Sequence, residues 1–256
     1  MSGAPSEGPA AAAQPLLSIV LATFNERRNL PQVVDRIRQQ RLPPFEIIVV
    51  DDGSTDGTRE FLDEAARSDP WIRPVYHEGK QTTVRAQCQG IGVATGRLVV
   101  IMDADLQHPP ELLPSMVQQL QGGSALVLAS RYAPGGSPGP RTLARWFYSH
   151  GAALAAAIYL PEARRVKDPV SGYFGFRREI WIPLDPEIRG YKLSLFLLVM
   201  ANGRPVTEVP FRFEPRTEGA SKVTESSAFI GMYLREVRLA RRLRNELHGS
   251  GRSPAG

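Results

Sequence analysis

The sequence predicts an α/β fold in which a mostly parallel sheet is covered by helices on both faces. Between residues 16 and 130, continuous apolar runs of strand length alternate with segments whose apolar residues recur at helical spacing. Such runs are typical of strands buried on both faces, as in parallel sheets with amphipathic helices on either side. Aspartates directly follow two of the runs, and parallel sheets bind ligands beyond the carboxyl ends of their strands.

The first part of the chain keeps one rhythm of strand and helix. We expect strands at residues 16–24, 45–50, 72–76, 98–103 and 125–130, and helices at 29–40, 58–68, 84–94 and 110–120. Beyond residue 132 the rhythm changes. A Gly/Pro-rich segment precedes a helix at 142–159, a turn and strand at 168–179, an apolar helix at 191–203 and a strand at 205–213. The prolines of the last strand suit the edge of a sheet.

The chain divides into one large domain, a helix and two tails. Its 256 residues are enough to bury a substantial core. Residues 1–15 and 248–256 are non-periodic and rich in small residues and proline, so we expect both to be disordered. Between them we expect a single domain at 16–225 and a basic amphipathic helix at 226–247.

Composition indicates a cytoplasmic protein. The single cysteine, Cys88, excludes an intramolecular disulfide, and no Asn-x-Ser/Thr acceptor occurs, which favours a reducing compartment. The longest apolar stretch, residues 143–160, is interrupted by Arg145 and His150. It falls short of the roughly 20 clean residues that a transmembrane helix needs, so we expect no membrane span.

Positive charge gathers at the C-terminal end. Net charge is +5, and residues 211–256 alone hold nine Lys/Arg against five acids. Such an end indicates an anionic partner, whether phosphate, acidic lipid or nucleic acid. In residues 226–247, apolar side chains follow one broad face and arginines occupy much of the rest. That pattern suits anionic lipid headgroups, and a helix docked on the core with a solvated basic side is the alternative.

A pair of aspartates ends one predicted strand and is a candidate metal site. Asp103 and Asp105 project to the same side of an extended chain, and Gln107 joins them if the chain stays extended. Hard oxygen ligands suit Mg²⁺ or Mn²⁺, which bridge carboxylates to substrate phosphates. An Asp-x-Asp pair also arises by chance, but its place between a buried strand and a helix favours the metal. A nucleic-acid-binding module would not explain these aspartates, so no nucleic acid partner is expected.

A second aspartate pair ends the strand at 45–50. A carboxylate at Asp52 can accept hydrogen bonds from a nucleobase or a ribose. The alternative is a turn in which Asp or Ser side chains cap the next helix, and Ser54 or Asp56 can serve that purpose.

Six segments of the chain together resemble one enzyme family. In order they are ATFNERRNLP, EIIVVDDGSTDGT, GRLVVIMDADLQHPPE, ASRY, KDPVSGYFGFRRE and PRTEGASK. They resemble family-2 glycosyltransferases of the dolichol (polyprenol) phosphate mannose synthase type, over roughly residues 17–222. The strings DADLQHPP and DPVSG are the most specific. The resemblance implies a GT-A fold, a GDP-mannose donor, a dolichyl or polyprenyl phosphate acceptor and a Mg²⁺ or Mn²⁺ cofactor.

The resemblance also implies roles for individual residues. The metal would be held by Asp103, Asp105 and Gln107, with Ala104 beside the nucleotide. The nucleoside would be lined by Ala22, Phe24, Glu26, Val50 and Asp52. The donor phosphates would meet Arg131, Arg216 and Lys222, and the acceptor phosphate would meet Arg145 and Ser149. Asp105 and Arg131 would be the catalytic residues.

The chemistry of the acceptor predicts an inverting mechanism. Donor and acceptor phosphates repel each other, so cations and guanidinium groups must offset their charge. A phosphate monoester is already largely ionised near neutral pH, and we therefore expect no catalytic base. Direct displacement at the anomeric carbon would invert it. The enzyme would work peripherally on the cytosolic face of a membrane, bound to the membrane surface or to a small membrane subunit.

The chain departs from the family's usual pattern in three places. Ala22 and Phe24 stand where Pro-x-Tyr is usual, Arg85 lies in a segment that is usually Gly-rich, and Phe196 replaces a common acidic residue. These changes concern the sugar and the nucleobase more than the reaction. The alternative function is therefore transfer from another donor, UDP-glucose or UDP-GlcNAc, or transfer to a non-lipid acceptor.

Overall fold

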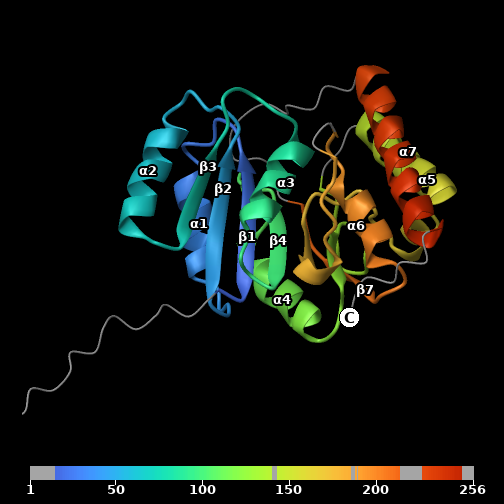
Figure 1. Ribbon diagram of the computed structural model, residues 1–256, viewed down its shortest axis with the longest axis horizontal. Coiled ribbons are helices and arrows are strands. Elements are labelled where there is room, and N and C mark those ends of the chain that lie inside the picture. The colour runs from blue at the N-terminus through green and yellow to red at the C-terminus, as the bar shows by residue number, and fades with distance from the viewer. Residues whose placement is uncertain (1–14, 140–142, 186–187, 189, 214–226, 250–256) are drawn as a thin grey trace, which may run out of the picture.

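A seven-stranded sheet forms the centre of the computed structural model (Figure 1). The structure describes residues 15–139, 143–185, 188, 190–213 and 227–249, so almost all of the two predicted tails lies outside it. The strands are β1 (Leu17–Thr23), β2 (Phe45–Asp51), β3 (Ile72–Tyr76), β4 (Leu98–Asp103), β5 (Leu126–Ser130), β6 (Phe174–Arg177) and β7 (Val206–Pro210). The α-helices are α1 (Leu30–Arg38), α2 (Thr58–Ser68), α3 (Thr83–Val93), α4 (Leu113–Gln121), α5 (Leu143–Tyr159), α6 (Leu193–Ala201) and α7 (Ser227–Gly249).

The strand order β3-β2-β1-β4-β6-β5-β7 reverses at β1, because β2 and β4 lie on its two sides. β6 is antiparallel to β4 and β5, and the other neighbouring pairs are parallel. The predicted, mostly parallel sheet is thus confirmed, and β7 lies at an edge as expected. Reversal of strand order opens a crevice at the carboxyl ends of the strands. Ala22 of β1 lies opposite both Val50 of β2 and Asp103 of β4, at the centre of that crevice.

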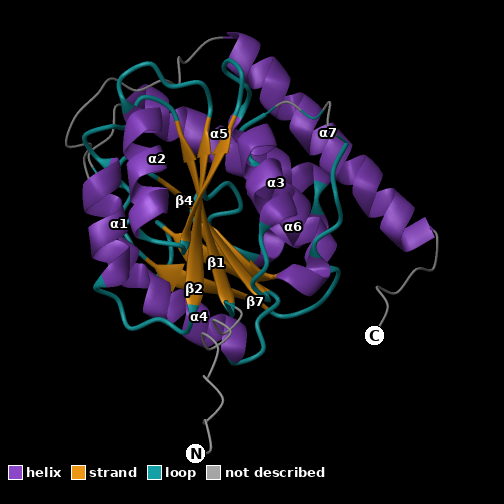
Figure 2. Ribbon diagram, turned by 60° about the vertical axis from the view of Figure 1, so that its left-hand side comes forward, coloured by secondary structure: helices purple, strands orange, loops and turns teal. Residues whose placement is uncertain are grey.

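Both faces of the sheet are apolar, because successive side chains of a strand point to opposite sides. In β2, Ile48 and Val50 belong to a core shared with α3 and α6. Ile47 and Val49 belong to the opposite core, shared with α1, α2 and α4. Figure 2 shows these helical layers on the two sides of the strands.

An outer layer of helices covers α6. All nine residues of Leu193–Ala201 are buried, and a helix that is apolar all round needs cover on every side. α7 provides part of that cover through Tyr233, Val237 and Ala240, which join the same core. The Tyr233 hydroxyl also donates a hydrogen bond to the Ala152 carbonyl of α5 at 2.6 Å. The inner face of the C-terminal helix is therefore part of the packed structure (Figure 1).

Close packing of α3 on the sheet predicts a contrast between two glycines of that helix. A Cβ added at Gly90 would clash with Val20 and Val50, whereas one added at Gly92 would meet open space. We expect Gly90→Ala to lower the free energy of unfolding by about 1 to 2 kcal/mol through overpacking. Gly92→Ala should raise it by about 0.5 to 1 kcal/mol, since alanine is the better helix former. Denaturant titration measures both, and equal effects would contradict this packing.

Candidate functional site

A cavity of about 250 Å³ lies at the carboxyl ends of β1, β2 and β4, beside the first turns of α3 and α6. Among the residues expected to bind the nucleotide-sugar, it is lined by Ala22, Phe24, Glu26, Asp52, Asp103, Ala104 and Asp105. The other lining residues are Thr23, Lys80, Gln81, Thr83, Ala86, Gln87, Gly172, Tyr191 and Lys192. The structure therefore gathers residues from six separate segments around the predicted crevice.

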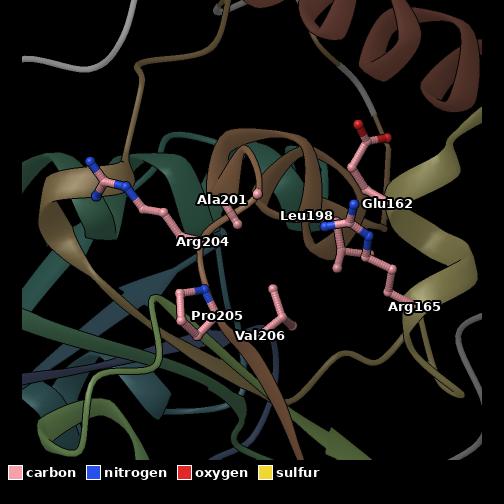
Figure 3. Close-up of a pocket in the computed structure, with 8 residues that line it drawn as sticks. Glu162, Arg165, Leu198, Ala201, Arg204, Pro205 and Val206 are labelled. Atoms are coloured by element: carbon pink, nitrogen blue, oxygen red, sulfur yellow. The ribbon is translucent and has the colours of Figure 1, made fainter.

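A second cavity, of about 230 Å³, lies at the far end of α6 (Figure 3). Its polar lining consists of Glu162, Arg165 and Arg204. Val206, which also lines it, begins β7 and so lies at the amino end of a strand that runs parallel to β5. Ligands of parallel sheets bind at the opposite end, and this cavity has no aspartate pair. The first cavity is therefore the candidate site.

Two aspartates face the candidate site from the end of β4. The side chain of Asp103 is 42% exposed, whereas Asp105 is only 6% exposed. The chain does not stay extended beyond them, because Leu106 has a left-handed backbone with φ of 63°. Gln107 instead donates its backbone N–H to Asp105 Oδ1 at 3.2 Å. The alternation that grouped Gln107 with the two acids ends there, and Gln107 does not line the cavity.

The buried side chain of His108 stabilises this turn, a role that the sequence reasoning missed. Its Nδ1 accepts the backbone N–H of Asp103 at 2.9 Å, and its ring stacks on Tyr173 with centroids 4.9 Å apart. Burial lowers the pKa of His108 from its ordinary value of 6.5 to about 4. The ring is therefore neutral near pH 7, as an accepting Nδ1 requires.

The donor set of the site fits a hard divalent cation. Asp103 and Asp105 offer only carboxylate oxygens from two positions of one turn. Mg²⁺ typically takes one or two protein carboxylates and completes its shell with waters and substrate phosphates. Within the described residues no cluster of three His, Cys, Asp or Glu side chains gathers. The two aspartates would hold an ion that also binds phosphate.

Asp52 lies at the opposite side of the cavity and is only 7% exposed. Its Oδ1 accepts the Gln81 backbone N–H at 2.8 Å and lies 2.9 Å from Nδ1 of His77. The neighbouring turn is closed by other groups: Asp51 bonds Ser54, and Asp56 accepts the Thr58 N–H. The capping alternative therefore does not occupy Asp52, whose carboxylate remains at the cavity.

Two buried polar atoms at the cavity have no hydrogen-bond partner within the described residues, Thr23 Oγ1 and Gln87 Oε1. Buried polar groups are nearly always bonded, so both atoms indicate a ligand with hydrogen-bonding groups. Sequence reasoning missed both: Thr23 lies in the segment ATFNERRNLP but was given no role, and Gln87 lies in none of the six segments. Nearby, the Lys80 ammonium lies 4.6 Å from the ring centroid of Phe24. Val50, expected at the nucleoside, is fully buried beneath the cavity.

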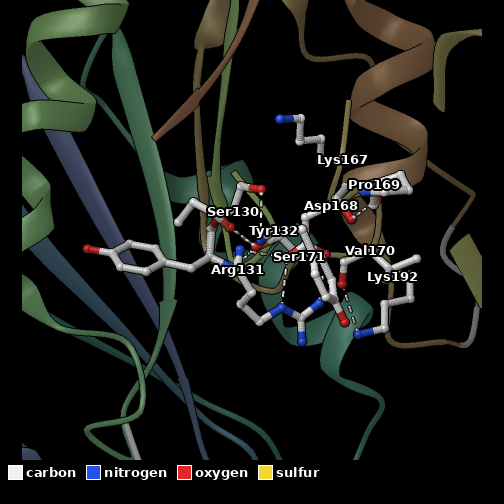
Figure 4. A network of polar contacts seen from close by, with 12 residues as sticks. Ser130, Arg131, Tyr132, Lys167, Asp168, Pro169, Val170, Ser171 and Lys192 are labelled. Atoms are coloured by element: carbon white, nitrogen blue, oxygen red, sulfur yellow. Dashed lines mark hydrogen bonds and ion pairs between the residues drawn. The ribbon is translucent and has the colours of Figure 1, made fainter. Parts of the chain in front are cut away.

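Arg131 is held by a buried ion pair (Figure 4). Its Nε and Nη2 donate to the two carboxylate oxygens of Asp168, each at 2.7 Å. The Arg131 backbone N–H adds a third bond to the same carboxylate at 3.1 Å. Burial lowers the pKa of Arg131, but the hydrogen bonds and charge of Asp168 outweigh this and raise it. Arg131 does not line the cavity, although it lies close enough for its positive charge to lower the pKa of Lys192.

Lys192 is a second cation at the site that the sequence did not reveal. It precedes α6, lines the cavity and donates from Nζ to the Val170 carbonyl at 3.1 Å (Figure 4). Burial lowers the pKa of Lys192, and the nearby Arg131 lowers it further. An anionic ligand in the cavity would oppose both effects.

Other expected residues cannot be placed at the site. Arg216 and Lys222 lie outside the described residues. Arg145 and Ser149 lie in α5, but their side chains are outside the described part of the structure.

Comparison with known proteins gives one consistent result. Residues 18–182 match the model of glycosyl transferase family 2. A dolichol-phosphate mannosyltransferase from Pyrococcus furiosus is 36% identical over 223 residues, which are 86% of this chain and 62% of that protein. The enzyme of that name from Saccharomyces cerevisiae is 32% identical over 86% of this chain and 85% of its own. A polyprenol monophosphomannose synthase from Mycolicibacterium smegmatis is 33% identical, with 84% and 83% covered.

Solved structures support the expected fold. Glucosyl-3-phosphoglycerate synthase from Mycobacterium tuberculosis, crystallised with Mn²⁺, UDP-glucose and phosphoglyceric acid, has a TM-score of 0.64 at 23% identity. The likeness covers 90% of this chain and 80% of that one and concerns the fold. The GT-A fold implied by the sequence is confirmed.

The buried, neutral His108 predicts a specific acid sensitivity. In the unfolded chain this histidine takes up a proton near pH 6.5, whereas in the folded protein it does so only near pH 4. Between these values protonation favours the unfolded state, so the free energy of unfolding should fall by about 3 kcal/mol as the pH drops. His108→Asn can keep an acceptor for Asp103 without titrating. In metal-free buffer, denaturant titrations should show a flatter acid profile for this variant, and an unchanged profile would contradict the assignment.

Proposed function

The chain belongs to glycosyl transferase family 2, and we propose that it transfers mannose from GDP-mannose to a dolichyl or polyprenyl phosphate. The proposal is carried by the Asp103–Asp105 pair, which faces the cavity at the point where the strand order of the sheet reverses. It is supported by relatives named for this activity, whose similarity extends over most of the chain. The chain spans 62% of the Pyrococcus relative.

The two sides of the cavity suit the two ends of the donor. Asp52, Thr23 and Gln87 provide polar atoms for the base and ribose, beside the aromatic ring of Phe24. Asp103 and Asp105 would hold Mg²⁺ or Mn²⁺ at the diphosphate. When bound, the ion offsets the negative charge of the leaving diphosphate. Gln107 remains a proposed third ligand.

The acceptor requires no proton abstraction by the protein. Its phosphate monoester is largely ionised near neutral pH, so one of its oxygens can attack the anomeric carbon directly as the bond to the diphosphate breaks. This displacement inverts the anomeric carbon. The task of the protein is to bring three phosphates together against their repulsion, and Arg131 is the proposed guanidinium for that purpose. Arg145, Ser149, Arg216 and Lys222 remain proposed phosphate contacts.

The first test is transfer itself, with donors compared. We expect GDP-mannose and a short polyprenyl phosphate to give the mannosyl phospholipid, detected by mass spectrometry, and chelation of divalent ions to abolish the reaction. Because Ala22 and Phe24 depart from the usual pattern, UDP-glucose and UDP-GlcNAc are assayed in parallel. Product from either of these alone would favour the alternative donor.

The metal assignment predicts the effect of a single substitution. Asp105→Asn keeps the size of the side chain but removes a charged ligand, so the transfer rate should fall about 100-fold or more. Asp35→Asn is the control, because that aspartate is 66% exposed on α1, and it should leave the rate unchanged. Full activity of Asp105→Asn would contradict a metal at this position.

We propose that α5 and α7 bring the enzyme to an anionic membrane surface on the cytosolic side. No helix in the described residues is long and apolar enough to span a membrane. The large apolar side chains that are exposed within those residues all belong to α5 and α7: Leu154, Ile158, Tyr159 and Ile230. α7 also exposes four arginines, Arg235, Arg238, Arg241 and Arg242. Apolar side chains beside basic ones suit an anionic interface.

Membrane contact can be measured with vesicles. Replacing the four exposed arginines of α7 by glutamine should weaken binding to phosphatidylserine vesicles by more than about tenfold, since each basic residue near such a surface contributes about 1 kcal/mol. Binding of the unmodified chain should weaken with salt and be slight on neutral phosphatidylcholine vesicles. If the chain binds neither kind of vesicle, a membrane subunit is the favoured anchor.

A further inference from the structure

We infer that the C-terminal helix completes the donor site: Glu236 of α7 positions Lys192, and the Lys192 ammonium binds the diphosphate of the donor. This inference rests on the proposed function, because it assumes a nucleoside-diphosphate ligand in the cavity. It adds a phosphate-binding residue and a positioning residue to the site.

In the described part of the chain no carboxylate forms a close ion pair with the Lys192 ammonium, although Asp168, Glu236 and Asp103 lie near enough to favour its charged form. Its one hydrogen bond there, from Nζ to the Val170 carbonyl, uses one of the three donors of an ammonium group. Arg131, by contrast, already directs Nε and Nη2 to the carboxylate of Asp168. Buried charges are normally paired. An ammonium that has donors to spare and lines a cavity beside Asp103 and Asp105 therefore points to an anion that binds there.

Glu236 fixes the backbone from which Lys192 extends. It is 1% exposed on the inner face of α7, and its Oε1 accepts the backbone N–H groups of Tyr191 and Lys192 at 2.7 and 3.0 Å. These N–H groups precede the first turn of α6, where helices leave donors unsatisfied and favour negative charge. Lys192 itself provides no side-chain cap, so α7 supplies the acceptor.

Gly190 connects this contact to the rest of the cavity. A Cβ at Gly190 would clash with the Glu236 carboxylate, so only glycine allows the carboxylate to approach this backbone. On its other side, the Gly190 carbonyl accepts the Val84 N–H of α3 at 3.1 Å. The next residues of that helix include Ala86 and Gln87, which line the cavity. The turn at 190–192 thus lies between α7 and the part of α3 that lines the cavity.

The ammonium is tested by nucleotide binding. Calorimetry with GDP, and separately with UDP, in the presence of Mn²⁺ should show that Lys192→Met weakens binding about 10- to 100-fold, as expected for a lost hydrogen bond to a charged group. Binding of the free nucleoside, guanosine or uridine, should not change. Lys167→Met removes an exposed lysine near the site and is the matched control. Equal affinity of the Lys192 and Lys167 variants for the diphosphate would overturn the assignment.

The positioning role is tested by variants of α7. Glu236→Leu removes the acceptor and should weaken diphosphate binding at least about 5-fold, whereas Glu236→Gln, which keeps an oxygen, should retain most of it. Tyr233→Phe removes a different hydrogen bond of this helix, the one to the Ala152 carbonyl, and should leave affinity unchanged although it loosens the docking of α7. If Glu236→Leu does not fold, Gly190→Ala takes its place, since the added methyl displaces the carboxylate.

The outcomes separate the inference from the proposed function. If the unmodified chain binds neither nucleoside diphosphate with Mn²⁺, the proposed function fails and this inference fails with it. If it binds them and neither Lys192→Met nor the Glu236 variants alter affinity, only the inference fails. Equal losses in Tyr233→Phe and Glu236→Leu would show that helix docking in general, and not this contact, matters.

Discussion

The buried pair of Arg131 and Asp168 is the interaction on which the charge balance of the site depends. Breaking a buried ion pair by removing one partner typically costs about 3 to 5 kcal/mol, and here Asp168 also holds the Arg131 backbone. The backbone N–H of Asp168 is itself bonded to Glu208 of β7, so the pair ties together β5, β7 and the loop before β6. Asp168 balances the charge of Arg131 beside the cavity, and the cations that line the cavity itself are Lys80 and Lys192.

Three aspartate carboxylates gather at the cavity although their negative charges repel one another. Asp103 and Asp105 share one turn, and Asp52 faces them from the end of β2. Each has local support: His108 holds the Asp103 backbone, Gln107 bonds Asp105, and Gln81 bonds Asp52. The supports are neutral N–H and imidazole groups, which fix geometry and leave the charge of the carboxylates available to a cation.

The sequence was sufficient for the sheet and for the position of the acids. Long apolar runs predicted the strands, and aspartates after two of them predicted the ligand-binding edge. The sequence could not predict that the chain turns at Leu106, because a left-handed leucine has no local signal. Nor could it predict the antiparallel β6 between β4 and β5. Lys192 and Glu236 were missed for a related reason: 44 residues separate them, and their significance appears only once α7 packs on α6.

One face of α7 packs on the protein core and the opposite face is exposed to solvent. The inner face carries Tyr233, Val237 and Glu236, which are buried against α5 and α6. The outer face carries arginines that remain exposed. Since one helix cannot move its outer face without moving its inner face, any force that displaces α7 also acts on the Glu236 contacts to Tyr191 and Lys192. A surface suited to an anionic membrane and a turn at the donor cavity are thus mechanically joined through a single carboxylate.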